Sequence, residues 1–123
     1  MTVSSPPSVS VFRFADNCQS FAPGQAIFEE GQPGNLMYVV QEGSVDVVVR
    51  GKVVDTVGPG GIVGEMALID QQPRSATAIA KTECKLVPVD EQRFKHLVQQ
   101  TPFFAIEVMR VMAHRLRRMD AKS

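Results

Sequence analysis

Glycine spacing limits the fold of this chain more than any other feature. All nine glycines lie between residues 24 and 64, and short runs rich in β-branched and aromatic residues lie between and after them. These runs cover residues 26–28, 36–41, 44–50, 52–57, 76–80 and 85–89. Many short strands with frequent turn signals are typical of a sandwich, a jelly roll or a small barrel. We therefore predict a mainly β fold, an eight-stranded β-roll or jelly roll (a double-stranded β-helix), over about residues 20–89.

The run from 44 to 57 predicts a hairpin with one apolar face. Val45, Val47 and Val49 alternate along its first segment, which places their side chains on the same face of a strand. Gly51 then supplies a turn into a second segment that contains Val54. We expect the apolar face of this hairpin to point toward the interior.

Helical spacing replaces the strand pattern after residue 89. Asp90 is a suitable N-cap, and apolar residues follow it at spacings of three and four, so we predict a hinge helix over about residues 90–100. Thr101 and Pro102 provide a second helix start, because proline fits the first helical position without losing a hydrogen bond. We predict a longer C-terminal helix over about residues 102–120.

The C-terminal helix carries a narrow apolar stripe. Met109, Met112, Leu116 and Met119 recur at spacings of three, four and three. Such a stripe either covers a core or forms the seam of a homodimer, and the sequence leaves both possibilities open.

Length and charge limit the domain count and the partners. At 123 residues the chain fits one compact domain, which we place at 11–123 after a flexible N-terminal lead-in at 1–10. The 13 basic side chains balance the 13 acidic ones, which argues against direct nucleic-acid binding, because phosphate neutralisation needs a basic excess. We interpret the basic cluster around residues 114–122 as a solvated helix face rather than a nucleic-acid site.

Cysteine usage and the N-terminus predict a cytoplasmic location. Cys18 and Cys84 show none of the short spacings of metal or redox motifs, so thiols in a reducing compartment are expected. The first ten residues lack the basic and apolar regions of a signal peptide, and no apolar run is long enough to span a membrane.

The sequence offers little support for catalysis. His96 and His114 both fall on predicted helices, whereas a cupin-type metal site uses histidines on strands. No serine or cysteine has a histidine and a carboxylate at a recognisable motif spacing. We therefore predict no catalytic residues, no metal, no cofactor and no enzyme activity.

The segment from 60 to 77 carries the chemistry of a phosphate site. Residues 65–69 favour a short helix between two strands, and a helix start directs backbone N–H groups toward an anion. Gly64 has no Cβ and lets a phosphate approach closely. Arg74, on a loop stiffened by proline, offers a planar fork for phosphate oxygens, and Ser75 adds a hydroxyl.

Glu65 does not fit a site for phosphate alone. A carboxylate repels an anion, but it accepts hydrogen bonds from a sugar hydroxyl, as the acidic residue of dinucleotide sites does. A ribose acceptor beside a phosphate cation indicates a nucleotide, and the absence of a lysine-containing Walker loop argues against a triphosphate. The alternative is a surface ion pair between Glu65 and Arg74, worth well under about 1 kcal/mol.

Two motifs resemble those of the cyclic-nucleotide-binding domain family. Gly-Glu-Met-Ala-Leu at 64–68, followed by Pro-Arg-Ser-Ala-Thr at 73–77, resembles the family's phosphate-binding cassette. Glu-Gly-Gln-Pro-Gly-Asn-Leu-Met-Tyr at 30–38, with Glu-Gly-Ser-Val at 42–45, resembles its glycine-spaced strand pair. The likeness extends from about residue 11 to residue 119.

This resemblance implies a set of ligand-binding residues. Glu65 would bind the ribose 2′-hydroxyl, Arg74 the cyclic phosphate, and Ser75 would help to hold that phosphate. Backbone N–H groups near Gly64, Glu65, Met66 and Ala67 would complete the cradle, Val47 and Val54 would pack on the base, and Leu116, Met119 and Asp120 are candidates for a lid.

The resemblance also implies a function. We expect a non-enzymatic regulatory sensor for a cyclic nucleotide, in which ligand binding pulls in the hinge helix and moves the C-terminal helix over the base. We favour cAMP over cGMP, because a threonine at the place of Ser75 is the family feature tied to cGMP. The alternative is a degenerate member that acts as a protein-interaction or dimerisation module without nucleotide. The sequence does not identify the output partner.

Overall fold

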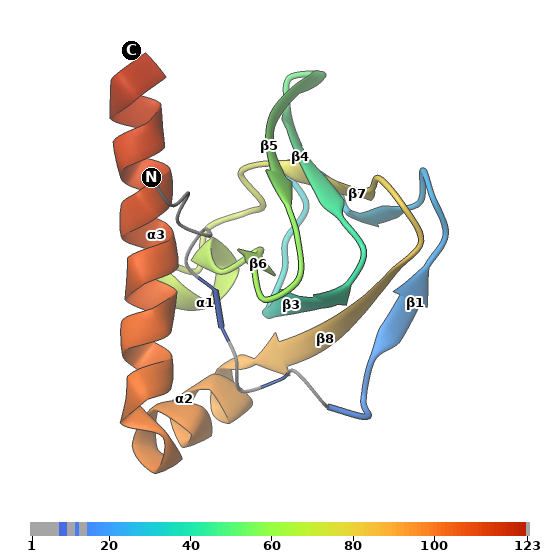
Figure 1. The fold of residues 1–123 in the computed structure, drawn as a ribbon. Helices are drawn as coiled ribbons and strands as arrows, with labels where there is room; N and C mark the ends of the chain where they lie inside the picture. Colours follow the sequence, from blue (N-terminus) through green and yellow to red (C-terminus); the bar gives the residue numbers. More distant parts are fainter. Residues whose placement is uncertain (1–7, 10–11, 13–14, 123) are drawn as a thin grey trace, which may run out of the picture.

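Eight strands and three helices form the described part of the chain (Figure 1). The computed structural model describes residues 8–9, 12 and 15–122, with side chains as far as residue 118. The strands are β1 (Gln19–Phe21), β2 (Ala26–Phe28), β3 (Leu36–Glu42), β4 (Val45–Val49), β5 (Lys52–Val57), β6 (Ile62–Val63), β7 (Thr77–Ala80) and β8 (Cys84–Asp90). The helices are α1 (Met66–Ile69), α2 (Glu91–Gln100) and α3 (Pro102–Lys122).

The strands pair into two four-stranded antiparallel sheets. The first has the order β1-β8-β3-β6 and the second the order β2-β7-β4-β5. This arrangement confirms the prediction of an eight-stranded jelly roll followed by two helices. Two of the strands, β1 with three residues and β6 with two, lie outside the predicted runs.

Strand β3, inside the first sheet, is buried on both faces. Alternate side chains of β3 serve two different cores: Tyr38 and Val40 pack between the sheets, whereas Met37 and Val39 pack toward the helices. Phe104 of α3 belongs to the core on the helix side, together with Met37 and Val39. The strand therefore links the interior of the jelly roll to the surface that carries the helices.

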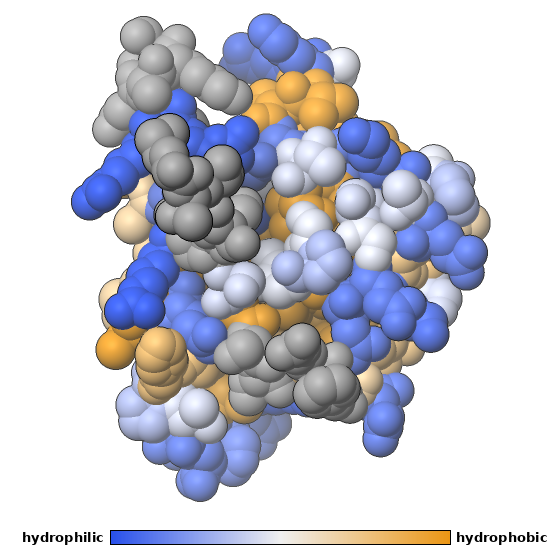
Figure 2. All heavy atoms as spheres, in the orientation of Figure 1, coloured by the Kyte–Doolittle hydropathy of each residue, from blue (hydrophilic) through white to orange (hydrophobic). Residues whose placement is uncertain are grey.

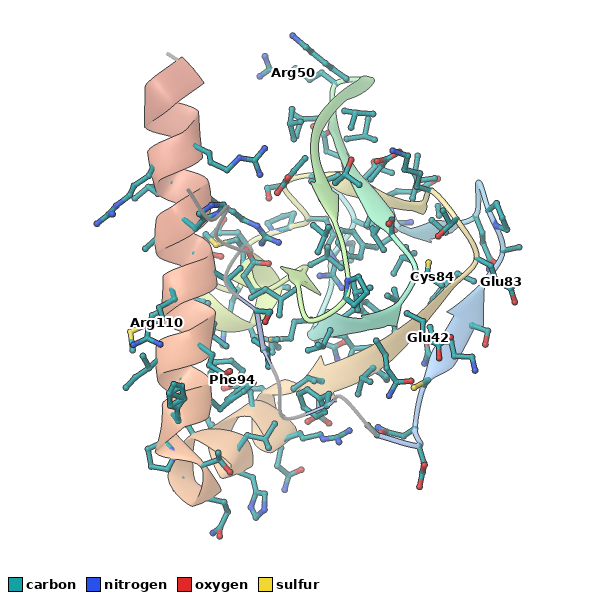
Figure 3. The ribbon with its side chains drawn as sticks, viewed as in Figure 1. Glu42, Arg50, Glu83, Cys84, Phe94 and Arg110 are labelled. Atoms are coloured by element: carbon teal, nitrogen blue, oxygen red, sulfur yellow. The ribbon has the colours of Figure 1, made fainter. Side chains whose placement is uncertain are left out.

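The predicted β4–β5 hairpin is present, and its turn has two residues. Val49 pairs with Lys52, and the intervening Arg50 and Gly51 have φ angles of 52° and 78°. Positive φ at both central positions is the type I′ geometry that matches strand twist. A register shift between Val47 and Val48 bends the hairpin, which Figure 3 shows with Arg50 at its tip.

The two C-terminal helices begin where the sequence predicts. Asp90 caps α2, because its side chain accepts a hydrogen bond from the backbone N–H of Arg93 (2.8 Å). Phe94 of α2 packs edge-on against Phe104 of α3, with ring centroids 5.4 Å apart. This contact fixes the corner between the helices at the lower end of the view in Figure 3.

The buried face of α3 differs from the predicted stripe. Phe104, Val108 and Val111 face the core, whereas Met109 and Leu116 are 59% and 64% exposed. The open alternative that the stripe covers the core is therefore wrong for those two residues. Apolar side chains are visible at the outer edge of α3 in Figure 2. The stripe is divided between two faces of the helix, since Met112 packs against the helix-side core while Met109 and Leu116 lie on the outer face.

The expected flexible lead-in at 1–10 falls mainly outside the described residues. Within it, Val9 is buried in the helix-side core, and its N–H donates to the Gly60 carbonyl (2.6 Å). That residue is part of the folded domain rather than of a lead-in. Over the described residues, no helix combines the length and the apolar character that crossing a membrane requires.

Candidate functional site

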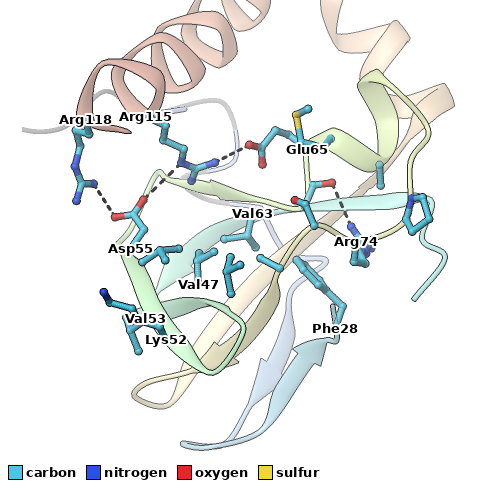
Figure 4. Close-up of a pocket in the computed structure, with 18 residues that line it drawn as sticks. Phe28, Val47, Lys52, Val53, Asp55, Val63, Glu65, Arg74, Arg115 and Arg118 are labelled. Carbon is cyan, nitrogen blue, oxygen red and sulfur yellow. Dashed lines mark hydrogen bonds and ion pairs between the residues drawn. The ribbon is translucent and has the colours of Figure 1, made fainter. Parts of the chain in front are cut away.

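A cavity of about 690 Å³ opens between the β4–β5 hairpin, the segment around α1 and the C-terminal half of α3 (Figure 4). This volume suits a ligand of nucleotide size. Its lining comprises Phe28, Val47, Val49, Lys52, Val53, Val54, Asp55, Val63, Gly64, Glu65, Met66, Ala67, Pro73, Arg74, Ser75, Ala76, Arg115 and Arg118. The wall is thus largely apolar, with charged groups gathered at a few places.

Arg74 is a buried cation at one end of the cavity. Its residue is 7% exposed, and its guanidinium lies 4.0 Å from the Phe28 ring centroid. Nη1 donates to the Gly64 carbonyl (3.2 Å), whereas Nε is buried and has no hydrogen-bond partner in the described part of the chain. Burial lowers the pKa of Arg74, and the nearby Tyr38 and Glu65 oppose that effect only in part. A buried guanidinium in this condition is stabilised by an anion.

Two glycines make room for this guanidinium. A Cβ on Gly64 would lie 2.5 Å from Arg74 Nη1, and its φ of 76° also disfavours any larger residue. A Cβ on Gly34 would lie 2.3 Å from Arg74 Nε. The glycine-spaced segment at 30–38 therefore shapes the arginine site directly.

Glu65 is a second buried charged residue of the cavity lining, and it lies between Arg74 and the arginines of α3 (Figure 4). It occupies the N-cap position of α1 but makes no side-chain capping bond, so its carboxylate is not used by the helix. The residue is 8% exposed, and Oε1 accepts a hydrogen bond from Arg115 Nη1 at 2.7 Å. The alternative of a surface ion pair between Glu65 and Arg74 is therefore wrong, because both residues are buried and Glu65 pairs with another arginine.

A charged cluster links α3 to the cavity mouth. Arg115 also donates to the Ile62 carbonyl, and its Nε lies 3.7 Å from Asp55 Oδ2. Arg118 Nη1 reaches Asp55 Oδ1 at 2.7 Å. Two arginines of α3 thus contact two carboxylates on different walls of the cavity.

The structure brings most of the predicted site residues together. The predicted residues that line the cavity are Gly64, Glu65, Met66, Ala67, Arg74, Ser75, Val47 and Val54. The Ala67 N–H donates to the Gly64 carbonyl (3.3 Å), so this member of the predicted cradle is already used within the turn.

Of the three predicted lid residues, only Leu116 has a described side chain. Leu116 is outside the cavity lining and points a largely exposed side chain elsewhere. Met119 and Asp120 lie outside the residues whose side chains are described. Arg115 and Arg118 occupy the position that sequence reasoning gave to Leu116.

Sequence reasoning missed Arg115, Arg118 and their partner Asp55. The interpretation of the basic cluster as a solvated face is wrong for Arg115, which is buried to about three quarters of its side chain, with 23% exposed. The signal was the continuation of the buried face of α3, since Arg115 follows Val111 by four residues and Arg118 follows by three more. Phe28, beneath Arg74, was also missed and left no sequence signal.

The two histidines lie on α2 and α3, as predicted. Among the residues that the structure describes, no group of three His, Cys, Asp or Glu side chains is placed to hold a metal ion. Cys18 and Cys84 are both free thiols, and burial raises the pKa of Cys84.

Comparison with known proteins shows which family this chain resembles. A model of the cyclic nucleotide-binding domain matches residues 18–101. The chain is 38% identical over 80 residues to a cAMP-dependent protein kinase regulatory subunit of Eremothecium gossypii, covering 65% of this chain and 18% of that protein. It is 30% identical over 105 residues to a CRP-like cAMP-activated global transcriptional regulator of Mycobacterium tuberculosis, covering 81% of this chain and 47% of that protein.

A solved structure agrees with these sequence relatives. The catabolite activator protein of Thermus thermophilus superposes with a TM-score of 0.74 at 29% identity, over 86% of this chain and 53% of that one. The chain spans less than half the length of the two curated relatives. Since residues 18–101 contain both sheets and the whole segment that carries Glu65 and Arg74, the chain belongs to the cyclic nucleotide-binding domain family.

Proposed function

We propose that this chain is a regulatory domain that binds cAMP and passes the binding event to its C-terminal helices. The observation that carries the proposal is Arg74, a buried guanidinium that is paired with no carboxylate in the described structure and has a free Nε. A desolvated cation of this kind is stabilised by the phosphate of a ligand. Gly34 and Gly64 leave the space in which it is held.

The remaining lining suits the other parts of a nucleotide. Glu65 presents a carboxylate for the ribose 2′-hydroxyl, and Ser75 presents a hydroxyl near the phosphate end. Val47 and Val54 offer apolar surface for a purine. We assign the backbone N–H groups of Gly64, Glu65 and Met66 to the phosphate.

We assign cAMP rather than cGMP on two grounds. The two curated relatives are named as a cAMP-dependent kinase subunit and a cAMP-activated regulator. Ser75 also stands where a threonine would favour cGMP in this family. The chain itself acts as a non-enzymatic sensor in the cytoplasm, where its two free thiols suit a reducing compartment.

Coupling to the helices is the mechanistic part of the proposal. Ligand in the cavity shifts the positions of α2 and α3, and it does so only by its different affinity for the two helix positions. The contacts of Arg115 and Arg118 with the cavity mouth support a route from ligand to α3. Leu116, Met119 and Asp120 stay candidates for a lid in the ligand-bound position.

A second candidate function rests on the outer face of α3. Phe103, Ile106, Met109 and Leu116 are large apolar residues that are all more than two fifths exposed. Exposed apolar surface of this extent is typical of an interaction site. It favours a homodimer through α3, either as part of the sensor or as the sole role of a domain that has lost its ligand.

Thermal unfolding with and without nucleotide tests the proposed function. At a cAMP concentration of 100 times the dissociation constant, the ligand adds about 2.7 kcal/mol to the free energy of unfolding. For a domain of this size we expect the melting temperature to rise by roughly 10 °C with cAMP and less with cGMP. If neither nucleotide raises the melting temperature, the proposed sensor function fails and the interaction module is the remaining candidate.

The variant Arg74→Ala is the control for the site. Calorimetric titration should show a loss of roughly 2 to 5 kcal/mol in cAMP binding, because the phosphate would lose its buried counter-charge. Arg117→Ala, an exposed arginine outside the cavity lining, should bind as the unchanged protein does. A loss below threefold for Arg74→Ala would remove Arg74 from the phosphate site.

A further inference from the structure

Arg74 is held firmly by its backbone and only weakly by hydrogen bonds from its side chain. Its N–H donates to the Gln32 carbonyl (2.8 Å), and its own carbonyl accepts from the N–H of Gly31 (2.8 Å). Within the described part of the chain, the guanidinium makes one hydrogen bond, from Nη1 to the Gly64 carbonyl at 3.2 Å. A single bond leaves the guanidinium able to turn about it, so a second contact is needed to fix its orientation.

The ring of Phe28 supplies this second contact. The central guanidinium carbon of Arg74 lies over the ring, 4.0 Å from its centroid, and Figure 4 shows the two side chains together at one end of the cavity. The face of an aromatic ring carries negative charge density and attracts a cation, most strongly where water is excluded. Because Arg74 is buried, solvent weakens this attraction little.

The ring is itself held in place. Phe28 belongs to β2 and packs against the core between the sheets, where it stacks with Tyr38 at a centroid distance of 6.2 Å and an interplanar angle of 24°. A register shift between Ala26 and Phe28 interrupts the pairing of β2 with β7, and irregularities of this kind change the direction of a side chain. Phe28 also lines the cavity, so it gives the guanidinium a fixed apolar support there.

A ring and a carboxylate stabilise a guanidinium in different ways. A carboxylate binds in the plane of the guanidinium, where it takes up N–H donors and neutralises the charge. A ring against the face leaves the charge and the in-plane donors available. Among the described residues, no carboxylate forms an ion pair with Arg74, and its Nε has no hydrogen-bond partner. Arg74 thus keeps its charge and free donors for an anion.

We propose that Phe28 is a positioning residue for phosphate recognition: its ring holds the Arg74 guanidinium in one orientation and leaves in-plane donors free for the phosphate of the ligand. This inference rests on the proposed function, since it assumes that a cyclic nucleotide places its phosphate at Arg74. It adds that an aromatic side chain of β2 sets the selectivity between the two exocyclic oxygens of that phosphate. A guanidinium held in one orientation binds one of these oxygens better than the other.

The test measures the binding of cAMP and of its two phosphorothioate diastereomers, in which sulfur replaces one or the other exocyclic oxygen. In the unchanged protein we expect titration to give affinities for the diastereomers that differ about tenfold, because sulfur at the preferred position weakens a charged hydrogen bond.

Phe28→Leu removes the ring and should change both quantities. We expect the cAMP affinity to fall about tenfold, which is within the range of a desolvated cation–π contact. The affinity ratio between the diastereomers should fall below about threefold, since a guanidinium without the ring can turn toward whichever oxygen remains.

Phe28→Tyr and Phe21→Leu are the matched controls. Tyrosine keeps the aromatic face, so Phe28→Tyr should keep the cAMP affinity within about threefold and should preserve the diastereomer ratio. Phe21→Leu makes the same side-chain change against the same core but outside the cavity lining, and it should leave both quantities unchanged. Melting temperatures of all variants without ligand identify any loss that comes from unfolding.

The NMR signal of the Arg74 Nε–H group tests the geometry without nucleotide. A proton over the face of an aromatic ring is shielded, so we expect this signal to lie at higher field in the unchanged protein than in Phe28→Leu. Its absence from the spectrum of Arg74→Ala identifies it. A signal in the unchanged protein without this shielding would overturn the inference before any variant is titrated.

The titrations separate the inference from the proposed function. An equal loss for both diastereomers in Phe28→Leu, with their ratio kept, would show that Phe28 only packs the cavity wall, and would overturn the inference. Losses in Phe28→Tyr as large as those in Phe28→Leu would also overturn it, since the aromatic face would not be their cause. If the unchanged protein binds neither cAMP nor cGMP, the proposed function fails, even where the shielded signal places Arg74 on the ring.

Discussion

At the scale of single residues, the molecule combines two buried charges that are not paired with each other. Arg74 packs on Phe28 and bonds to a backbone carbonyl, whereas Glu65 pairs with Arg115. Burying a charge is costly unless other groups compensate for it, so each of the two depends on a neighbour that sequence spacing does not reveal. The space around Arg74 depends in turn on Gly34.

Gly34→Ala tests that dependence without adding backbone strain. The new Cβ would lie 2.3 Å from Arg74 Nε and would displace the guanidinium. Overpacking of this kind costs about 1 to 3 kcal/mol, and we expect cAMP affinity to fall at least tenfold as the arginine moves. Gly58→Ala is the matched control, because nothing lies within 4 Å of a Cβ at Gly58. Unchanged affinity in Gly34→Ala, measured by titration, would contradict this account of the arginine site.

Much of the candidate site could be predicted from the sequence because its parts lie close together along the chain. Gly64, Glu65 and Arg74 fall within one short segment and reach the same cavity. Arg115 could not be assigned in this way, since its partner Glu65 lies fifty positions away and the choice of helix face decides the contact. A single sequence does not determine which face of a helix is buried when apolar residues occur on two sides of it.

At the scale of elements, the β4–β5 hairpin forms one wall of the cavity and contains a strained position. Arg50 has a φ of 52°, a left-handed conformation that costs an ordinary residue energy. Its N–H donates to Glu30 Oε1 (3.1 Å), a backbone bond that any residue with an N–H could keep. The turn was foreseeable from Gly51, but the positive φ of its neighbour was not, because the arginine side chain gives no sign of it.

Arg50→Asn should stabilise the hairpin. Asparagine and glycine at the two central positions suit a type I′ turn, and we expect the free energy of unfolding to rise by about 0.5 to 1 kcal/mol. The measurement is chemical denaturation without ligand. Lys52→Asn, two residues further along and with an ordinary φ, should give no gain. A lower stability of Arg50→Asn would show that the arginine side chain contributes more than the turn geometry costs.

At the scale of the whole molecule, one side of the domain carries the cavity mouth and another the outer face of α3. The long helix belongs to both, since Arg115 and Arg118 reach the cavity while Met109 and Leu116 stay exposed. The jelly roll and the two helices could be predicted because strand alternation and helix caps are local patterns. The exposure of Met109 and Leu116 could not be predicted, because it depends on which face of α3 packs against the sheet.

The pair of substitutions Met109→Lys and Leu116→Lys tests whether α3 pairs with a second copy. We expect light scattering to show a dimer for the unchanged protein and a monomer for the double variant, because two lysines on each helix would repel one another across an apolar seam. The thermal shift with cAMP should persist in the monomer. Ile69→Lys removes an exposed apolar residue of α1 and should leave the dimer intact. A monomeric unchanged protein would contradict the dimer.

The alternation of β3 has a consequence for how this domain tolerates change. Met37 and Val39 point one way, and Tyr38 and Val40 point the other, so a single inserted residue would exchange the contents of two interiors at once. Insertions in the exposed turns carry no such penalty. We expect length differences among relatives of this chain to lie in the loops and not in β3. This strand separates the core between the two sheets from the core beside the helices.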